Sequence, residues 1–455
     1  MPQAADPYRL TAEAIREPPR TLAGSLRHIG PGLILAGAIV GSGELIATTV
    51  LGAEYGYTLL WLILVSCAIK VVVQGEIGRY AVVTGETTLR AFNRAPGPRL
   101  RVAWPVWLWV VMVSAVMFSV GGMLGAIGGI LHRFVPALPA SGWIWVVDGV
   151  TVALLLSGRY GLVEKPSLAL VATFTFVTAG AAVILLQNPE FFSAADLFEG
   201  LAFRMPDGGV ATAATVFGAT GVGAGELMMY PYWCLEKGYA RFSGPPTGSP
   251  AWARRVRGWM RVMSLDVLCS LAIYTASTLA FYLLGAGVLA KLGVIPQGLA
   301  MVNQLSNIYT ETLGSWSFSL FMAGAIAVFY STIFSVTAAH GRLFADLLLL
   351  LGLGDPADYA RRLLLVRVGI VVTTIAPTLC FFLVEEPVLM VMIGGVAQAL
   401  MLPVIAGMTI YLTARRVPRA VTASPALRAA LWATAGVMAL AALYYLFRVA
   451  SDYSA

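Results

Sequence analysis

Two short glycine-rich stretches carry acidic side chains into apolar parts of the chain: Val40-Gly41-Ser42-Gly43-Glu44-Leu45 and Val222-Gly223-Ala224-Gly225-Glu226-Leu227. Glycine lowers helix stability by about 1 kcal/mol relative to alanine. A carboxylate at mid-bilayer depth costs roughly 2.5–3.5 kcal/mol even on lenient insertion scales. Carboxylates, freed backbone carbonyls and a hydroxyl together make an all-oxygen site, which favours Mg²⁺, Ca²⁺ or Mn²⁺ over soft metals. The predicted cation or substrate site therefore comprises Gly41, Ser42, Glu44, Val222, Gly223 and Glu226.

The two stretches are copies of each other. One offset pairs Val40 with Val222 and Glu44 with Glu226, and it continues to Glu54 and Glu236. Glycine-interrupted apolar segments at matching places in two halves of a chain point to the binding site of a transporter. The repeat therefore predicts two broken helices whose carboxylates face one cavity. Alone, a Gly-x-Gly pair can also serve close helix packing.

Composition restricts the class of protein. The 455 residues are 58% hydrophobic and 12% charged, and the mean hydropathy is +0.80. Soluble domains carry about 25% charged residues, so we expect a multi-span membrane protein in contact with lipid. The net charge of +7 is explained by orientation in the membrane, and no nucleic acid is expected as a partner.

Apolar segments of about 20 residues are long enough to cross a bilayer as helices. The sequence predicts eleven such spans, at 31–54, 57–78, 104–131, 143–157, 166–187, 210–233, 260–285, 313–340, 363–384, 387–413 and 428–449.

The distribution of the 30 lysines and arginines sets the expected topology, because cytoplasmic segments are enriched in these residues. With the N-terminus inside, the extracytoplasmic side keeps only Arg133, Arg204, Lys291 and Arg448, and Lys70 lies inside a span. We therefore expect a protein of the inner (cytoplasmic) membrane with its N-terminus in the cytoplasm and its C-terminus outside.

An odd number of spans separates the two acidic stretches, so the second half is inverted relative to the first. The predicted organisation is a cytoplasmic tail (1–29), a first five-helix repeat (30–187), an extracellular loop (188–209), a second five-helix repeat (210–413) and a cytoplasmic loop with an eleventh helix (414–455).

Several further segments resemble one known family. Gly30-Pro31-Gly32, Gly56-Tyr57-Thr58-Leu59-Leu60-Trp61, Val83-Thr84-Gly85 and Tyr330-Ser331-Thr332-Ile333-Phe334-Ser335-Val336-Thr337 are similar to segments of the Nramp (natural resistance-associated macrophage protein) metal-ion transporters. The resemblance covers nearly the whole chain. It implies an all-α, LeuT-like fold of the APC superfamily, with a 5+5 inverted repeat and broken helices 1 and 6.

The chain departs from that family at the site itself. The family's Asp-Pro-Gly-Asn falls on Gly41 to Glu44, and its Met-Pro-His falls on Val222 to Ala224. The family's two span-three acids, which lie on its proton route, fall on Ser119 and Gly122. In lacking the soft methionine thioether, the chain is similar to the Nramp-related magnesium transporters, which are the branch of the family that it resembles most. Proton coupling of the family type has few candidate carriers here.

Other polar groups inside spans have weaker signals. The resemblance implies that Gln398 reaches the ion. Ser331 and Thr332 resemble the place where relatives of this fold hold a coupling Na⁺, although Ser and Thr often bond to their own helix. The remaining candidates are a Lys70–Glu76–Arg79 ion-pair cluster, a helix-end cluster of His340 with Arg342 and Asp346, and two acids without an assigned role, Asp148 and Asp266.

The leading hypothesis is a monomeric secondary transporter of a hard divalent cation such as Mg²⁺ or Mn²⁺, working by alternating access without proton coupling and without a resident cofactor. The alternative is an APC-type transporter of a small organic cation or amino acid, because Ile39-Val40-Gly41-Ser42-Gly43 also looks like the glycine-rich break of those proteins. A third class is a cation sensor or scaffold that kept the fold. No nucleophile–base pair, Walker motif or redox-cofactor pattern indicates an enzyme.

Overall fold

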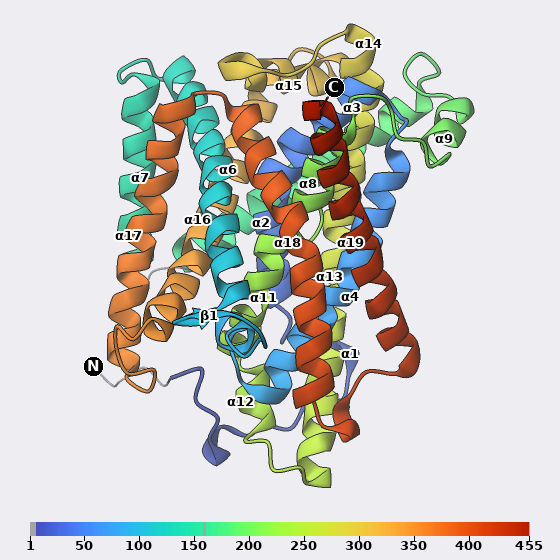
Figure 1. Cartoon of the computed structure of the whole chain (residues 1–455). Helices are drawn as coiled ribbons and strands as arrows, with labels where there is room; N and C mark the ends of the chain where they lie inside the picture. Colours follow the sequence, from blue (N-terminus) through green and yellow to red (C-terminus); the bar gives the residue numbers. More distant parts are fainter. Residues whose placement is uncertain (1–5, 158–160, 455) are drawn as a thin grey trace.

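The computed structural model describes residues 6–157 and 161–454, and these form an upright bundle of helices (Figure 1). Within this part of the chain the only strands are β1 (Arg99–Leu100) and β2 (Val102–Ala103), which pair antiparallel beside the start of α6. The N-terminal segment lies at one end of the bundle and the C-terminus at the other (Figure 1). The predicted all-helical class is confirmed.

A helix occupies each of the eleven predicted spans. In chain order they are α2 (Pro31–Ile39) with η2 (Val40–Thr48) and α3 (Thr49–Tyr55), α4 (Leu60–Thr84), α6 (Trp104–Phe134), α7 (Ala140–Leu156), α8 (Gly161–Gln187), α10 (Val210–Ala219) with α11 (Ala224–Lys237), α13 (Pro250–Leu284), α16 (Ser317–Leu350), α17 (Tyr359–Val384), α18 (Pro387–Arg416) and α19 (Pro425–Ser454). Among the described residues, seven helices are long and apolar enough to cross a membrane, and the bent α2–α3 segment makes an eighth. The others are shorter apolar helices or the interrupted α10–α11 pair.

Short helices fill the connections between spans. They are η1 (Ala12–Ala14), α1 (Leu22–Leu26), α5 (Thr88–Phe92), α9 (Ala194–Gly200), α12 (Tyr239–Ser243), α14 (Ala290–Leu292), η4 (Gly298–Ala300), α15 (Met301–Leu313) and η5 (Arg419–Val421), while the π-helical η3 (Gly285–Leu289) joins α13 to α14. α12 and α1 lie at the end of the bundle where the N-terminal segment starts, and α14 and α15 cover the opposite end (Figure 1).

Span six is broken as the sequence predicts. α10 ends at Ala219 and α11 begins at Ala224, which leaves four residues of non-helical backbone. Gly221 has a φ of +58°, a left-handed conformation that L side chains rarely adopt. Gly223 is then the N-cap of α11 in an extended conformation. The break exposes carbonyls at the end of α10 and N–H groups at the start of α11, both of which need partners.

Span one is interrupted differently. Its backbone passes through the π-helix η2 and bends by 43°, instead of unwinding at Gly41 and Gly43 as expected. The repeat offset that aligns the two stretches places Ile39 opposite Gly221. A β-branched residue cannot take the positive φ that the span-six break requires. The glycines of span one serve close packing instead: a Cβ on Gly43 would lie 2.6 Å from the Ala219 carbonyl oxygen.

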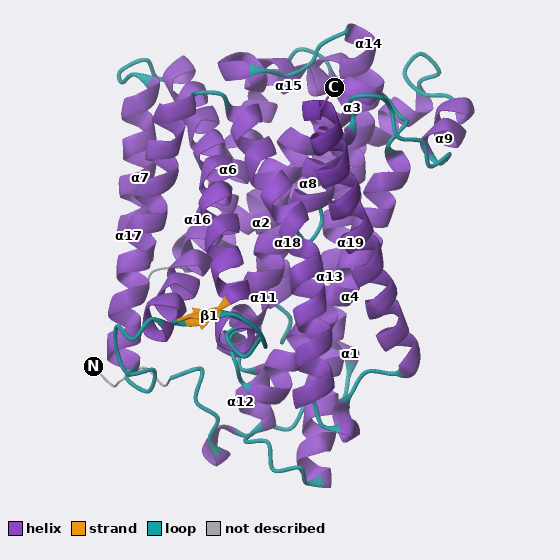
Figure 2. Cartoon of the chain, viewed as in Figure 1, coloured by secondary structure: helices purple, strands orange, loops and turns teal. Residues whose placement is uncertain are grey.

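The N-terminal segment, which the sequence predicts to be a tail, packs against the bundle. From residue 6 onward it runs along the base of the bundle, as a loop interrupted by the short helices η1 and α1 (Figure 2). The Tyr8 hydroxyl donates to Glu236 at 2.7 Å, and the Arg16 amide donates to the Phe242 carbonyl at 3.0 Å. Pro18 packs where Gly258 leaves room on α13. This segment therefore ties together the ends of α11, α12 and α13.

Candidate cation site

Glu226 lies in the first turn of α11, directly after the break in span six. The positive end of the helix dipole and the free N–H groups of this turn favour a carboxylate there. The Oε2 atom of Glu226 is buried and has no hydrogen-bond partner. A buried, unpartnered carboxylate oxygen is rare and costly in a folded protein, so this oxygen is available to a ligand.

A small cavity lies beside Glu226. It measures about 20 Å³, enough for one water molecule, which needs about 10–15 Å³. Five spans contribute to its wall: span one, α6, the α10–α11 pair, α16 and α18. Its polar lining comes from Glu226, Gln398, Ser119 and Thr332, and the rest is apolar or glycine.

Gly223 brings two of these oxygens close together. A Cβ on Gly223 would lie 2.6 Å from Glu226 Oε2 and 2.7 Å from Gln398 Oε1, so the two oxygens are at most 5.3 Å apart. Oxygen ligands sit about 2.0–2.6 Å from Mg²⁺ or Ca²⁺, so one ion bridges the two oxygens where they lie within about 4 Å of each other for Mg²⁺, or about 5 Å for Ca²⁺. Gln398 is held in place by the Gly225 amide, which donates to Oε1 at 3.0 Å.

Glu44 occupies a different position from the one predicted. It is fully buried, and its Oε1 accepts hydrogen bonds from the Gly221 amide and the Thr278 hydroxyl, both at 3.0 Å. It does not line the cavity beside Glu226. The expectation that both carboxylates face one pocket is therefore not met. Glu44 instead fastens span one to the break in span six and to α13, while its Oε2 keeps no hydrogen-bond partner.

Lys70 is the important residue that sequence reasoning misplaced. Its side chain is fully buried, and Nζ donates to the Thr220 carbonyl at 2.5 Å, inside the span-six break. The ammonium also lies 5.2 Å from the centre of the Phe217 ring and interacts electrostatically with Glu44 and Glu226.

Lys70 was expected to cluster with Glu76 and Arg79. Those two residues do pair, at 2.9 Å. Six residues separate Lys70 from Glu76, so their side chains point about 120° apart around α4, and Lys70 lies on the face that meets span six. A lysine within a span is by default a functional candidate, and that signal alone would have identified it.

The other predicted site residues have mainly packing or bonding roles. Thr332 donates to the Ala38 carbonyl at 2.9 Å and Ser331 to the Gly37 carbonyl at 3.4 Å, across to α2 and not within their own helix. Gly41 allows the approach of Thr332, because a Cβ there would lie within 3.0 Å of three atoms of that side chain. Val222 is buried in the break. The side chain of Ser42 lies outside the described residues.

The remaining polar groups have separate partners. Asp266 on α13 accepts from the amides of Gly30 and Gly32 at 2.8 and 2.6 Å, so it caps the start of α2. Asp148 accepts from Thr378 at 2.5 Å. The proposed His340 cluster does not form: Arg342 pairs with Glu236, Asp346 pairs with Arg362, and both ring nitrogens of His340 lack partners.

Across the described residues, no group of three or more His, Cys, Asp or Glu side chains is arranged to hold a metal ion. Glu226 is the charged donor that lines the cavity, and the other possible donors there are amide, hydroxyl and backbone oxygens and the sulfur atoms of Met123 and Met229. Such neutral oxygen donors suit Mg²⁺, Ca²⁺ and Mn²⁺.

Comparison with known proteins gives consistent results. The family described as "Natural resistance-associated macrophage protein-like" (Nramp) matches residues 32–448. An uncharacterized protein of Pasteurella multocida is 29% identical over 182 residues, and the divalent metal cation transporter MntH of Acidiphilium cryptum is 25% identical over 299 residues. The matches span 40% and 66% of this chain but only 41% and 64% of those two relatives.

Solved structures share the fold. A mutant form of the manganese transporter of Eremococcus coleocola aligns with a TM-score of 0.65 at 18% identity, covering 96% of this chain and 90% of that one. Mhp1, a nucleobase-cation-symport-1 family transporter, aligns with a TM-score of 0.57 at 14% identity, covering 92% and 91%. These alignments confirm the predicted LeuT-like architecture.

Proposed function

The chain belongs to the Nramp family, and on that premise we propose that it is a secondary transporter of a hard divalent cation, Mg²⁺ or Mn²⁺. The ion would bind in the cavity between Glu226 and Gln398, at the break of span six. The observation that carries this proposal is the pair of buried oxygens at most 5.3 Å apart beside Gly223, one of them a carboxylate oxygen without a partner.

The size of the cavity favours an ion over an organic substrate. A volume of about 20 Å³ accepts one water-sized object, whereas sites for small organic molecules measure roughly 300–1,000 Å³. An amino acid would require the surrounding helices to separate. The glycine-rich stretch of span one also lacks the unwound backbone whose N–H groups would hold a substrate carboxylate.

Charge balance assigns roles to Glu44 and Lys70. Two buried carboxylates repel each other unless a cation or a proton lies between them. Lys70 supplies a positive charge that belongs to the protein itself, bound to the Thr220 carbonyl. We propose that Lys70 offsets one of the two negative charges when no ion is bound, and that Glu44 holds the span-six break in shape while Glu226 contacts the ion.

Transport would not use proton carriers in α6. The Ser119 hydroxyl lies 3.4 and 3.5 Å from the Val391 and Met390 carbonyls, and Gly122 packs directly against the Pro387 backbone. Neither residue can accept and release a proton near neutral pH. We therefore propose uptake without proton coupling. The Ser331 and Thr332 hydroxyls, with the Gly37 and Ala38 carbonyls, remain the proposed location for a coupling ion.

The domain boundaries, a single-chain functional unit and the inner-membrane orientation with a cytoplasmic N-terminus are also proposals. They are supported by the basic residues on one side and by the two chain ends, which lie at opposite ends of the bundle (Figure 1).

Uptake into proteoliposomes tests the function. The protein is reconstituted with Mg²⁺- or Mn²⁺-sensitive dyes inside the vesicles, with and without a pH gradient. We expect saturable divalent uptake that is insensitive to the pH gradient and to an excess of amino acids or polyamines. Absence of divalent uptake, or its loss when the organic compounds are added, would overturn the proposal.

A further inference from the structure

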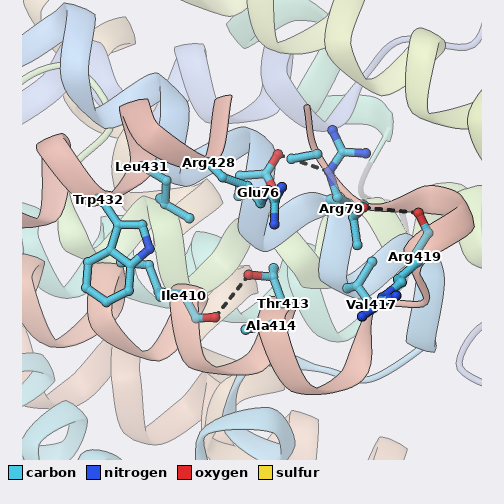
Figure 3. A pocket seen from close by; sticks show the side chains of 12 residues that line it. Glu76, Arg79, Ile410, Thr413, Ala414, Val417, Arg419, Arg428, Leu431 and Trp432 are labelled. Atoms are coloured by element: carbon cyan, nitrogen blue, oxygen red, sulfur yellow. Dashed lines mark hydrogen bonds and ion pairs between the residues drawn. The ribbon is translucent and has the colours of Figure 1, made fainter. Parts of the chain in front are cut away.

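A second cavity, separate from the cation site, lies at the end of the bundle that the N-terminal segment covers. It is a hollow of about 600 Å³ between the end of α4, the end of α18 and the first turns of α19. Figure 3 shows Glu76, Arg79, Arg419, Arg428 and Trp432 around it. Its size matches a site for a whole small molecule, for which about 300–1,000 Å³ is typical.

The charge of this cavity is positive. Arg79 and Glu76 pair at 2.9 Å and cancel each other, and Arg79 also donates to the Val421 carbonyl at 3.2 Å. Arg419 and Arg428 are exposed, and within the described residues neither guanidinium makes an ion pair or a hydrogen bond. Two uncompensated guanidinium groups therefore face the hollow, and guanidinium groups suit phosphate oxygens.

The loop that forms the cavity is fixed to the bundle. Arg257 on α13 donates to the Ala420 carbonyl at 2.9 Å, and Arg79 on α4 holds the next residue. Val421 itself is buried. The loop between α18 and α19 is thus anchored from two helices, which makes the hollow a built feature.

The apolar part of the lining indicates where the ligand comes from. Leu431 is buried and Trp432 is 65% exposed, near the start of α19, and Ile410 of α18 lines the hollow beside them. α19 is a candidate span, and only 22% of its most apolar window is buried inside the protein, which leaves most of that surface free to contact lipid. Its first turns lie where a span enters the bilayer, the depth at which tryptophan and phospholipid headgroups gather.

We propose that this cavity, defined by Arg79, Arg419, Arg428 and Trp432, binds the phosphate headgroup of an anionic phospholipid and so attaches α19 to α4 and α18. The two free guanidinium groups would contact the phosphate, and Leu431, Trp432 and Ile410 would contact the glycerol and upper acyl chains. This inference does not depend on which solute the protein transports.

Thermal unfolding and lipid titration of the purified full chain in a neutral detergent test the proposal. Phosphatidylglycerol, phosphatidylcholine and inorganic phosphate are added separately. We expect phosphatidylglycerol to raise the unfolding midpoint and to bind saturably, while phosphatidylcholine and inorganic phosphate have no comparable effect. A response to inorganic phosphate equal to that of phosphatidylglycerol would overturn the lipid assignment.

Two paired variants locate the effect. Arg419→Gln with Arg428→Gln should weaken phosphatidylglycerol binding about 30-fold, because each basic residue near an anionic lipid contributes about a five-fold factor. Arg254→Gln with Arg261→Gln removes the same charge from exposed positions on α13 outside the cavity and should leave binding unchanged. An equal loss of phosphatidylglycerol binding in both double variants would mean that the lipid is attracted by the overall positive charge, and it would refute a specific site in this cavity. If the first pair does not fold, each single variant, with an expected five-fold loss, gives the same decision.

Discussion

Gly223→Ala is the perturbation whose effect follows most directly from the geometry. The added methyl group would stand 2.6 Å from Glu226 Oε2 and 2.7 Å from Gln398 Oε1, whereas ordinary contacts begin at 3.4 Å. The two oxygens would have to retreat by about 0.8 and 0.7 Å. Ligand distances in metal sites hold to within about 0.2 Å, and misplacement by about 1 Å costs roughly 100-fold in comparable positioned sites. We therefore expect divalent affinity to fall by about 10- to 100-fold.

Two further glycines provide graded controls. A Cβ on Gly225 would lie 3.3 Å from Gln398 Oε1, only about 0.1 Å short of ordinary contact, and a Cβ on Gly129 of α6 would meet nothing within 4 Å. Mn²⁺ binding by calorimetry and Mn²⁺ uptake should thus fall strongly for Gly223→Ala, slightly for Gly225→Ala and not at all for Gly129→Ala. The unfolding midpoint is measured in parallel. If Gly223→Ala binds and transports like Gly129→Ala while folded, the cation does not sit between Glu226 and Gln398.

Three other outcomes are expected. Lys70→Met should tighten Mn²⁺ binding roughly 100-fold, because a unit charge and a divalent ion about 10 Å apart repel each other by about 3 kcal/mol at an effective dielectric constant near 20. Weaker binding by a folded variant, measured calorimetrically, would contradict the role given to Lys70. Asp266→Asn should lower the unfolding free energy by about 1.5–3 kcal/mol, because an asparagine side chain has one oxygen and cannot accept from both Gly30 and Gly32 as the carboxylate does. Exposed Glu311→Gln is the control, and equal unfolding midpoints of the two variants would refute the capping role of Asp266. Burial alone would raise the pKa of Glu86, but Arg94, Tyr80 and Arg416 outweigh burial and hold this pKa below its ordinary 4.5. The ionised Glu86 side chain therefore stabilises the fold fully above about pH 4.5, and this stabilisation is lost as the pH falls through the lowered pKa. In a plot of unfolding midpoint against pH, Glu86→Gln should reduce the fall of the midpoint at acid pH, and an unchanged fall would contradict this prediction.

Much of the architecture is readable from the sequence because bilayer crossing imposes a simple rule on composition. Apolar segments of about 20 residues predict the spans, and the alternating distribution of basic residues predicts their order across the membrane. The break in span six follows from Gly221 and Gly223. These features are local, so a single sequence contains enough information to find them.

The site was harder to predict because it depends on contacts between distant segments. The same Gly-x-Gly-Glu motif gives a break in span six and a π-helical bend in span one, since Ile39 stands where span six has Gly221. Symmetry suggested equivalent roles for the two glutamates, yet Glu44 finds partners in Gly221 and Thr278 while Glu226 borders the cavity. The position of Lys70 beside Thr220 depends on how α4 packs against span six, which chain proximity to Glu76 did not reveal.

Locating Mn²⁺ in crystals of the protein tests the central claim most directly. Crystals grown with Mn²⁺ are measured at a wavelength where manganese scatters anomalously. We predict one strong anomalous peak in the cavity at the span-six break, within coordination distance of Glu226 and Gln398, and its loss in Glu226→Gln crystals grown the same way. A peak elsewhere in the bundle, or one that persists in Glu226→Gln, would contradict the assignment of this cavity as the cation site.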